Sequence, residues 1–398
     1  MEKHYNKLRI KTLEHLLLPI IFFSYVYISY GIVIQGFVST EIQIYFNINQ
    51  NIVPLLNIPI FLGTSLGFYI YIYNSKIKYK KFFYSFLIMS IFINLFIIIL
   101  RNFLYFILAR LISAMGYGIL LGYLFNYYYF YKLQFNVKSI SLEWRNPFGI
   151  LLASLFSYYF VQILSWKSAF YFLLTGIFVI IGVSFLPNIH NIQNMQNIRF
   201  SLFKNLSKEK KFLVIQFMII YFIIGNNFYI LVMNIKYLLV SLLNNHIVSN
   251  IYLILFSLSI ILGYFISIYL YKNFNLKTLI ILLNLLLIFT SFLSLNIFSY
   301  NQEIYFISSN MIIQTILWNI FLIYSINYFD TFEIYTVIKL IFFMFFLGGI
   351  FSSFFSFLMF KNLYINIFLL IIIFTILFII MFLILSKNYN RHNHFMKR

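Results

Sequence analysis

Long apolar runs separated by short polar stretches dominate the pattern along this chain. Each run is continuously apolar over about 20 residues, which is the length that a helix needs to cross a bilayer. Barrel strands alternate apolar and polar positions over about 10 residues, so these runs indicate helices and not a β-barrel. The pattern predicts twelve membrane-spanning helices, at residues 14–37, 51–73, 82–100, 102–129, 146–165, 168–187, 211–235, 248–271, 278–299, 303–328, 336–359 and 362–386.

The longest polar stretch, residues 188–211, divides the twelve runs into two groups of six. We therefore expect a six-helix bundle at 1–187, a linker at 188–211 and a second six-helix bundle at 212–398. The two halves also share a local pattern, because residues 66–70 (LGFYI) and 262–266 (LGYFI) are each followed by two lysines at matching positions. Similar halves are typical of transporters whose substrate site lies between them. The predicted fold class is an all-α polytopic membrane protein with two pseudo-symmetric six-helix bundles.

Composition agrees with a membrane protein and excludes a soluble one. The chain is 63% hydrophobic and 9% charged, against about 45–50% and about 25% in soluble domains. With the N-terminus inside, 22 basic residues fall on the inner side and four on the outer side, namely Arg101, Lys167, Lys236 and Lys361. This positive-inside asymmetry predicts that both termini are cytoplasmic. The net charge of +20 is thereby explained by topology and not by nucleic-acid binding.

Arg110 stands deep in the fourth predicted span, roughly 12 Å from its outer end at 1.5 Å per residue. Charged groups inside a bilayer are costly and usually functional, so Arg110 is a candidate substrate contact, with Tyr117 on the same helical face. The alternative is that its side chain snorkels outward or that its guanidinium bonds backbone carbonyls. Small residues allow helices to approach closely, and we assign a packing or gating role to Gly63, Gly67, Gly116, Gly118 and Gly263.

Uncharged polar side chains supply further candidates. Asn227 lies in the seventh span, and Asn310, Gln314 and Trp318 form one stripe at i, i+4 and i+8 in the tenth. Amides beside an aromatic ring suit a hydroxylated or mixed polar and apolar ligand, although such amides also form interhelical hydrogen bonds. The eight acidic residues and six histidines lie outside the middle of every predicted span. We therefore expect no catalytic set, metal site or cofactor, and weak or absent proton coupling.

Three segments resemble the drug and sugar efflux branch of the major facilitator superfamily, which includes arabinose-efflux-type permeases. Residues 110–118 (RLISAMGYG) look like its fourth-helix motif, residues 165–170 (SWKSAF) with Leu186-Pro187 look like its sixth helix, and residues 74–81 look like its second-to-third loop. The resemblance implies that spans 1, 4, 7 and 10 line a central cavity. It thereby places near the substrate Tyr25, Ser29, Arg110, Tyr117, Asn227, Gln314 and Trp318.

The predicted function is secondary transport of a small solute by alternating access, with a sugar-like or small amphipathic substrate and export as the direction. The alternative is a facilitator or exchanger of an anionic metabolite, with Arg110 as its counter-charge. A non-transporting polytopic protein is the third class, and the repeated halves and the lack of a catalytic set weigh against it. The expected setting is a monomer in a bacterial inner membrane, with the solute and lipid as its partners.

Overall fold

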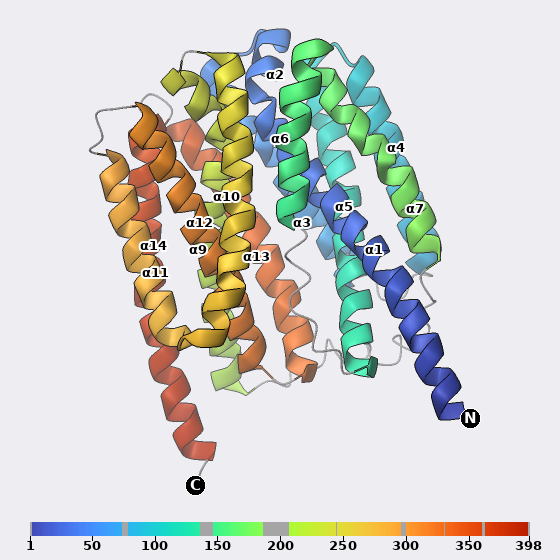
Figure 1. Cartoon of the computed structure of the whole chain (residues 1–398), viewed down its shortest axis with the longest axis vertical. Coiled ribbons are helices and arrows are strands. Elements are labelled where there is room, and N and C mark those ends of the chain that lie inside the picture. Colours follow the sequence, from blue (N-terminus) through green and yellow to red (C-terminus); the bar gives the residue numbers. More distant parts are fainter. Residues whose placement is uncertain are drawn as a thin grey trace.

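The computed structural model describes residues 2–73, 79–135, 146–185, 207–243, 245–295, 300–329, 331–359 and 363–396. These segments are nearly all helical (Figure 1). The α-helices and 3₁₀ segments (η) are α1 (Glu2–Phe37), α2 (Ser39–Phe46), η1 (Gln50–Asn57), α3 (Ile58–Tyr73), α4 (Tyr79–Ile99), α5 (Phe103–Phe135), α6 (Asn146–Ile163), η3 (Trp166–Thr175), α7 (Gly176–Ser184), α9 (Lys208–Leu243), α10 (His246–Asn273), α11 (Leu276–Leu295), α12 (Tyr300–Tyr328), α13 (Thr331–Leu358) and α14 (Leu363–Met396).

The helices correspond one by one to the twelve predicted spans. In the described part of the chain, ten helical stretches are long and apolar enough to cross a membrane. Two shorter apolar stretches, Tyr84–Ile99 and Pro147–Val161, stand where the third and fifth spans are predicted. These helices confirm the all-α, twelve-helix prediction. The physical reason is that a segment in lipid must satisfy its own backbone hydrogen bonds, and a helix does so.

Two spans are less regular than their sequence predicts. The second begins as η1, which contains Pro54, and becomes α-helical at Ile58. Proline lacks the backbone N–H that a continuing helix would use. The sixth span likewise begins as η3 and becomes α7 at Gly176. The hydrophobic pattern does not predict the short helix α2, which follows α1. Its C-cap is Asn47, whose backbone is left-handed with a φ of 51°.

The seventh span extends further than its hydrophobic run. The sequence pattern ends this span at residue 235 and places Lys236 in an outer loop. The structure corrects that placement, because α9 continues to Leu243 and the Lys236 side chain is 0% exposed. Lys236 is buried beside partners that belong to other helices. The hydrophobic pattern along α9 alone gives no information about those partners.

The two halves repeat one packing plan. In the first half α3 packs on α5, α4 on α5 and α1 on α6; in the second half the corresponding pairs are α10 on α12, α11 on α12 and α9 on α13. The halves meet mainly where α3 contacts α13, α6 contacts α10 and α1 contacts α9. The free ends of α1 and α14 project from the same end of the molecule, opposite α2 (Figure 1).

Glycines set the distance between two of these helix pairs. A Cβ atom added to Gly63 or Gly67 of α3 would collide with backbone carbonyls of α5, at Leu111 and Met115. Gly263 of α10 holds the equivalent place in the second half, against the backbone of α12 at Ile312. Because the backbones touch directly, any side chain at these positions forces the helices apart.

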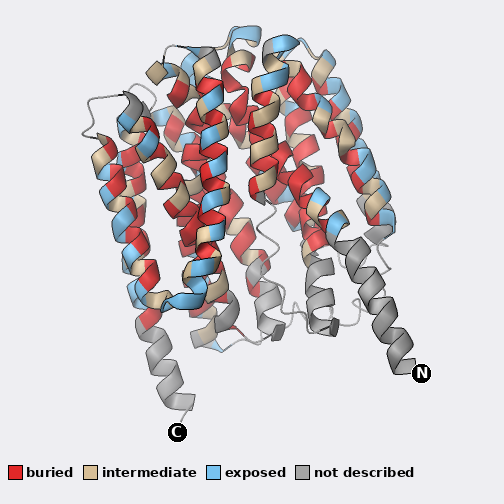
Figure 2. Cartoon of the chain, viewed as in Figure 1, coloured by how far each residue is buried: buried red, intermediate tan, exposed pale blue. Residues whose placement is uncertain are grey.

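Burial follows the arrangement expected in lipid. Buried residues fill the middle of the molecule and exposed residues lie on its outward faces (Figure 2). Many exposed side chains are large and apolar, among them Phe23, Ile99 and Phe178. In water such a surface would be unfavourable, whereas acyl chains cover it at no cost. Many polar side chains lie inside, and several of them bond to helix backbones or to neighbouring helices, among them Ser113, Asn234 and Ser353.

Candidate functional site

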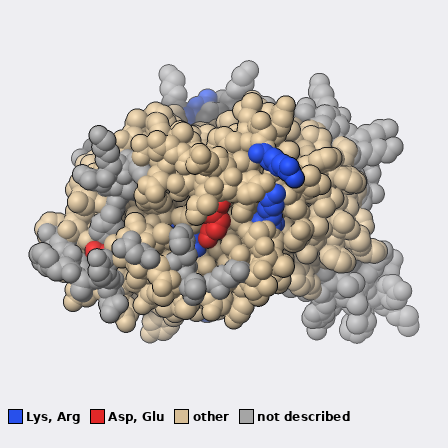
Figure 3. Space-filling model, turned by 90° about the horizontal axis from the view of Figure 1, so that it is seen from above, with Lys and Arg blue, Asp and Glu red and all other residues tan. Residues whose placement is uncertain are grey.

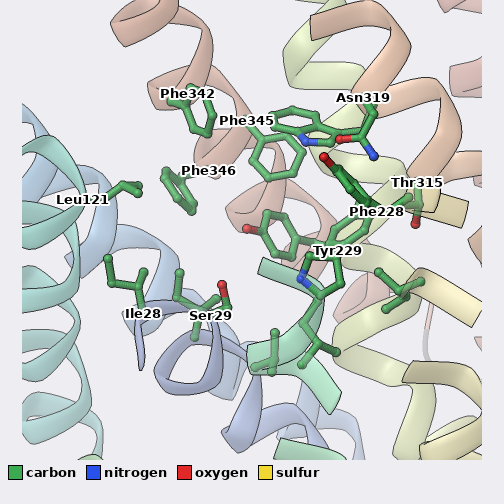
Figure 4. Close-up of a pocket in the computed structure, with 17 residues that line it drawn as sticks. Ile28, Ser29, Leu121, Phe228, Tyr229, Thr315, Asn319, Phe342, Phe345 and Phe346 are labelled. Carbon is green, nitrogen blue, oxygen red and sulfur yellow. The ribbon is translucent and has the colours of Figure 1, made fainter. Parts of the chain in front are cut away.

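A small cavity lies between the two halves, near the middle of the helices. It encloses about 70 Å³, which is room for about two waters at ~30 Å³ each. The first half contributes residues from α1, α5 and α6, and the second half contributes residues from α9, α10, α12 and α13. Because both halves line it, a relative movement of the halves would change its size and its opening. Figure 4 shows the lining side chains.

Aromatic rings form the second half's side of this cavity. The Trp318 ring lies 4.0 Å from that of Phe345 and 5.6 Å from that of Phe342, measured between centroids. Tyr229 continues the cluster, 5.0 Å from Phe345. In Figure 4 the rings of Phe345, Phe346 and Tyr229 face the first-half residues Ile28, Ser29 and Leu121. Flat, apolar faces of this kind bind a ring or another apolar face of a ligand.

Few polar groups interrupt the apolar lining. Asn319 of α12 is 3% exposed, and its Nδ2 has no hydrogen-bond partner. Thr315 lies one turn earlier on the same helix face, and its hydroxyl donates to the Met311 carbonyl at 2.8 Å. Ser29 lines the first half's side. Among the described residues that line the cavity, none is charged, so the lining suits a neutral ligand that offers a hydrogen-bond acceptor.

Arg110 lies inside the first half and is not among the lining residues. It is 0% exposed and ties α5 to α1. Its Nε donates to Gln35 Oε1 at 2.7 Å, and its Nη2 donates to the Gly31 carbonyl at 2.8 Å. The guanidinium carbon stands 5.1 Å from the centre of the Phe170 ring, a cation–π distance. Nη1 is buried without a hydrogen-bond partner.

Tyr117 belongs to the same interior cluster of the first half. Its hydroxyl accepts a hydrogen bond from Asn94 Nδ2 of α4 at 3.2 Å. Its ring packs edge-on against Tyr27 of α1, with centroids 5.6 Å apart. Gly31 of α1 faces this ring so closely that a Cβ there would collide with it. Arg110 and Tyr117 thus share a packed polar core between α1, α4 and α5.

The remaining predicted site residues lie in different surroundings. Ser29 and Trp318 line the central cavity together. Tyr25 is 1% exposed and packs near Phe125, with ring centroids 6.4 Å apart. Gln314 is 3% exposed, and neither of its amide atoms has a hydrogen-bond partner. Neither Tyr25 nor Gln314 is among the residues that line the cavity.

Asn227 and Asn310 face neighbouring helices of the second half. Asn227 Nδ2 donates to the Thr375 hydroxyl of α14 at 3.3 Å. Asn310 Oδ1 accepts from the hydroxyls of Thr290 and Ser291 of α11, at 3.2 Å and 2.8 Å. These amides therefore bridge helices within one half, away from the cavity between the halves.

The sequence stripe at Asn310, Gln314 and Trp318 reaches the cavity only at Trp318 and misses Thr315 and Asn319, which also line it. Successive residues on a helix are about 100° apart, so the stripe through Thr315 and Asn319 is turned by that angle. One helix alone does not reveal which of two adjacent stripes faces a cavity. The sequence did contain one signal for the Asn319 site: this amide directly follows Trp318.

A larger hollow, of about 450 Å³, lies on the outer surface of the first half between α1, α6, η3 and α7. Its lining comes from one half only. The Tyr27 hydroxyl donates to the Leu173 carbonyl at 3.2 Å, and the Thr175 hydroxyl donates to the Phe172 carbonyl at 2.6 Å. Apolar, exposed Phe178 stands at its edge. A rocking movement of the halves would leave this hollow unchanged, so we assign the site to the central cavity.

Comparison by sequence found no match: no family model matches the chain, and no curated protein matches it. Comparison by structure did. A crystal structure of a D-xylose–proton symporter superposes with a TM-score of 0.75 at 12% identity, covering 92% of this chain and 97% of that one. The E. coli xylose transporter XylE, partially occluded and inward open, gives 0.70 at 11%, covering 94% and 98%. A mutant of the nucleoside transporter NupG gives 0.65 at 14%, covering 94% and 99%.

At such identities the likeness concerns the fold. It extends over more than nine tenths of each chain, so it includes both halves of this one. The chain therefore has the same twelve-helix fold as these solved transporter structures.

Proposed function

We propose that this chain is a secondary transporter that carries a small neutral solute through the cavity between its halves by alternating access. The observation that supports this most directly is the cavity itself. Both halves line it, and its described lining combines an aromatic cluster, the unpartnered Asn319 amide and no charge. A solute with an apolar face and an acceptor oxygen, such as a sugar-like or small amphipathic compound, fits that lining.

In this proposal three side chains contact the solute. Trp318 stacks on its apolar face, Asn319 Nδ2 donates to an acceptor oxygen, and Ser29 contacts it from the first half. An unpaired buried amide is costly, so a ligand lacking that oxygen binds less well. At about 70 Å³ the cavity is below the roughly 300 Å³ of common ligand sites. The halves must therefore separate at one end before the solute enters.

The direction and setting of transport belong to the same proposal. The motifs that resemble efflux permeases support export. The distribution of basic residues supports cytoplasmic termini. The proposal also includes a bacterial inner membrane as the setting and the monomer as the working unit. Neighbouring folds that are sugar and nucleoside transporters support small polar solutes as the class to test first.

The chain has no cysteine, which permits a sharp test. Asn319→Cys, in membranes, should react with a neutral aromatic thiol reagent at least tenfold faster than with a sulfonate reagent, after correction for each reagent's rate with a free thiol. Asn310→Cys is the matched control, because Asn310 is on the same helix but bonded to α11, and it should be inert. Equal corrected rates at position 319 would contradict a cavity that selects neutral solutes.

Transport itself is tested in proteoliposomes. Flux of a matched pair, phenyl β-glucoside and its anionic counterpart phenyl β-glucuronide, should favour the neutral member. Trp318→Ala and Asn319→Leu should each reduce that flux by about tenfold or more, the effect of losing ~1.4 kcal/mol. Flux of neither compound, and of no member of a wider panel of neutral sugars and nucleosides, would refute the proposed function.

One observation favours a second candidate, an anionic solute bound by Arg110. Its Nη1 has no hydrogen-bond partner and would be available to a carboxylate if α1 moved away. This candidate requires the glucuronide to be preferred in the flux assay. It also requires Arg110→Lys to retain more transport than the uncharged Arg110→Met.

A further inference from the structure

A buried ion pair joins the two halves at the α2 end of the molecule. Lys236 Nζ lies 3.3 Å from Glu41 Oε1. Glu41 belongs to α2 in the first half, and Lys236 belongs to α9 in the second. The lysine side chain is 0% exposed and the glutamate 19%. Figure 3 looks onto this end, where a few charged side chains stand among the uncharged side chains of the described residues.

Each member of the pair also has a neutral partner in its own half. Lys236 Nζ donates to Asn250 Oδ1 of α10. Glu41 Oε2 accepts from the Thr40 hydroxyl at 2.8 Å. When the halves separate, neither charge is left without a hydrogen bond, and water entering the gap solvates both. A pair with this arrangement is suited to repeated breaking and re-forming.

The neighbouring packing brings the halves into direct contact at the same level. Gly36 of α1 lies against Met233 of α9, so closely that a Cβ there would press on the Met233 sulfur at 3.0 Å and on its backbone at 3.1–3.2 Å. Other contacts between the halves are aromatic. Phe125 and Phe342 have centroids 4.4 Å apart, Phe61 and Tyr229 4.3 Å apart, and Tyr69 and Phe343 6.2 Å apart. Within the described residues, the halves therefore meet through an ionic contact at the α2 end and through several pairs of aromatic rings.

We propose that the Glu41–Lys236 pair is a latch that holds the α2 end closed, and that its separation is the step that opens the cavity to that side. The latch rests on the proposed alternating access of the halves. A buried lysine loses much of its hydration and depends on its carboxylate, so losing either charge favours the open arrangement. The latch acts on the opening of one end and contacts no solute.

The test measures the gap at this end directly. Spin labels on Gln50→Cys of η1 and Ser241→Cys of α9, both exposed, report the distance between halves by pulsed electron spin resonance in lipid. Glu41→Gln and Lys236→Met should each raise the open-to-closed ratio by about tenfold. The charge swap, Glu41→Lys with Lys236→Glu, should return the distribution most of the way to that of the parent protein.

Lys167→Met is the matched control. Lys167 is a lysine at the same end that donates to the Tyr45 hydroxyl of α2 at 3.0 Å, but both residues belong to the first half. Its loss removes the same charge without removing a link between halves, so the distance should not change. A gap that opens equally in this variant would overturn the latch, because general loss of positive charge would then explain the effect.

The remaining outcomes also decide the question. An unchanged distribution in folded Glu41→Gln, a replacement of the same shape, would overturn the latch even if Lys236→Met failed to fold. A swap variant that stays as open as the single variants would overturn it too. The spin-label measurement needs no solute. If the protein transports solute but the gap does not widen in the Glu41 and Lys236 variants, only the latch is refuted. If the gap widens in these variants but no solute is transported, only the proposed transport is refuted.

Discussion

Replacing Arg110 by lysine and by methionine separates a structural role from a substrate-binding role. Lysine keeps the charge but has no planar fork to reach two acceptors at once. Methionine keeps much of the volume and removes the charge. If Arg110 mainly ties α5 to α1, the lysine variant should be the less stable of the two. If Arg110 binds an anion, the lysine variant should be the better transporter.

The contacts of Arg110 give the expected size of the stability effect. The bonds to Gln35 Oε1 at 2.7 Å and to the Gly31 carbonyl at 2.8 Å involve a charged donor, and each contributes ~1.5–3 kcal/mol. Lysine loses one of them and still carries the cost of a buried cation, so we expect ~1.5–3 kcal/mol of destabilisation. Methionine loses both but removes that desolvation cost of several kcal/mol, so its net change should be smaller, within ~1.5 kcal/mol.

The assay is reversible unfolding of the purified protein in mixed micelles, followed by tryptophan fluorescence, with flux in proteoliposomes measured on the same preparations. Arg101→Met is the control, because Arg101 is exposed and surface changes of this kind stay within about 0.5 kcal/mol. The structural role of Arg110 is refuted if Arg110→Lys is as stable as the parent, or if it transports well while an equally stable Arg110→Met does not. The second result would make Arg110 the counter-charge of an anionic solute.

Three further predictions concern packing, topology and energy coupling. Gly67→Leu should destabilise the protein by ~1–3 kcal/mol or more in the same unfolding assay, because the leucine side chain has to displace the α5 backbone at Met115. A stability equal to that of the parent would contradict the close approach of α3 and α5. Reporter fusions at Asn194 and Lys361 should report opposite sides of the membrane, as the distribution of basic residues predicts, and a common side would refute that topology. An imposed pH gradient of either sign should leave solute accumulation nearly unchanged, since the described cavity lining has no Asp, Glu or His; accumulation abolished by a protonophore would contradict this.

The sequence alone determined the number, the type and the approximate ends of the spans. The reason is that lipid leaves each segment to satisfy its own backbone, so a sufficiently long apolar run has essentially one solution. The repeat of the two halves was also visible in the sequence, because the motifs around Gly67 and Gly263 occur at the same point of each half. In both halves these glycines lie where two helix backbones touch.

Only the tertiary structure decided what each polar side chain faces. Arg110 meets Gln35, which is 75 residues away, and Lys236 meets Glu41 of the other half. Asn310 and Asn319 are both asparagines of α12. Asn310 bonds to α11, whereas Asn319 lines the cavity. Helical periodicity gives the angle between side chains on one helix, but the neighbours of each face depend on how all the helices pack together. The site of this protein was therefore visible in the sequence as a set of candidates, and the packing of the two halves selected among them.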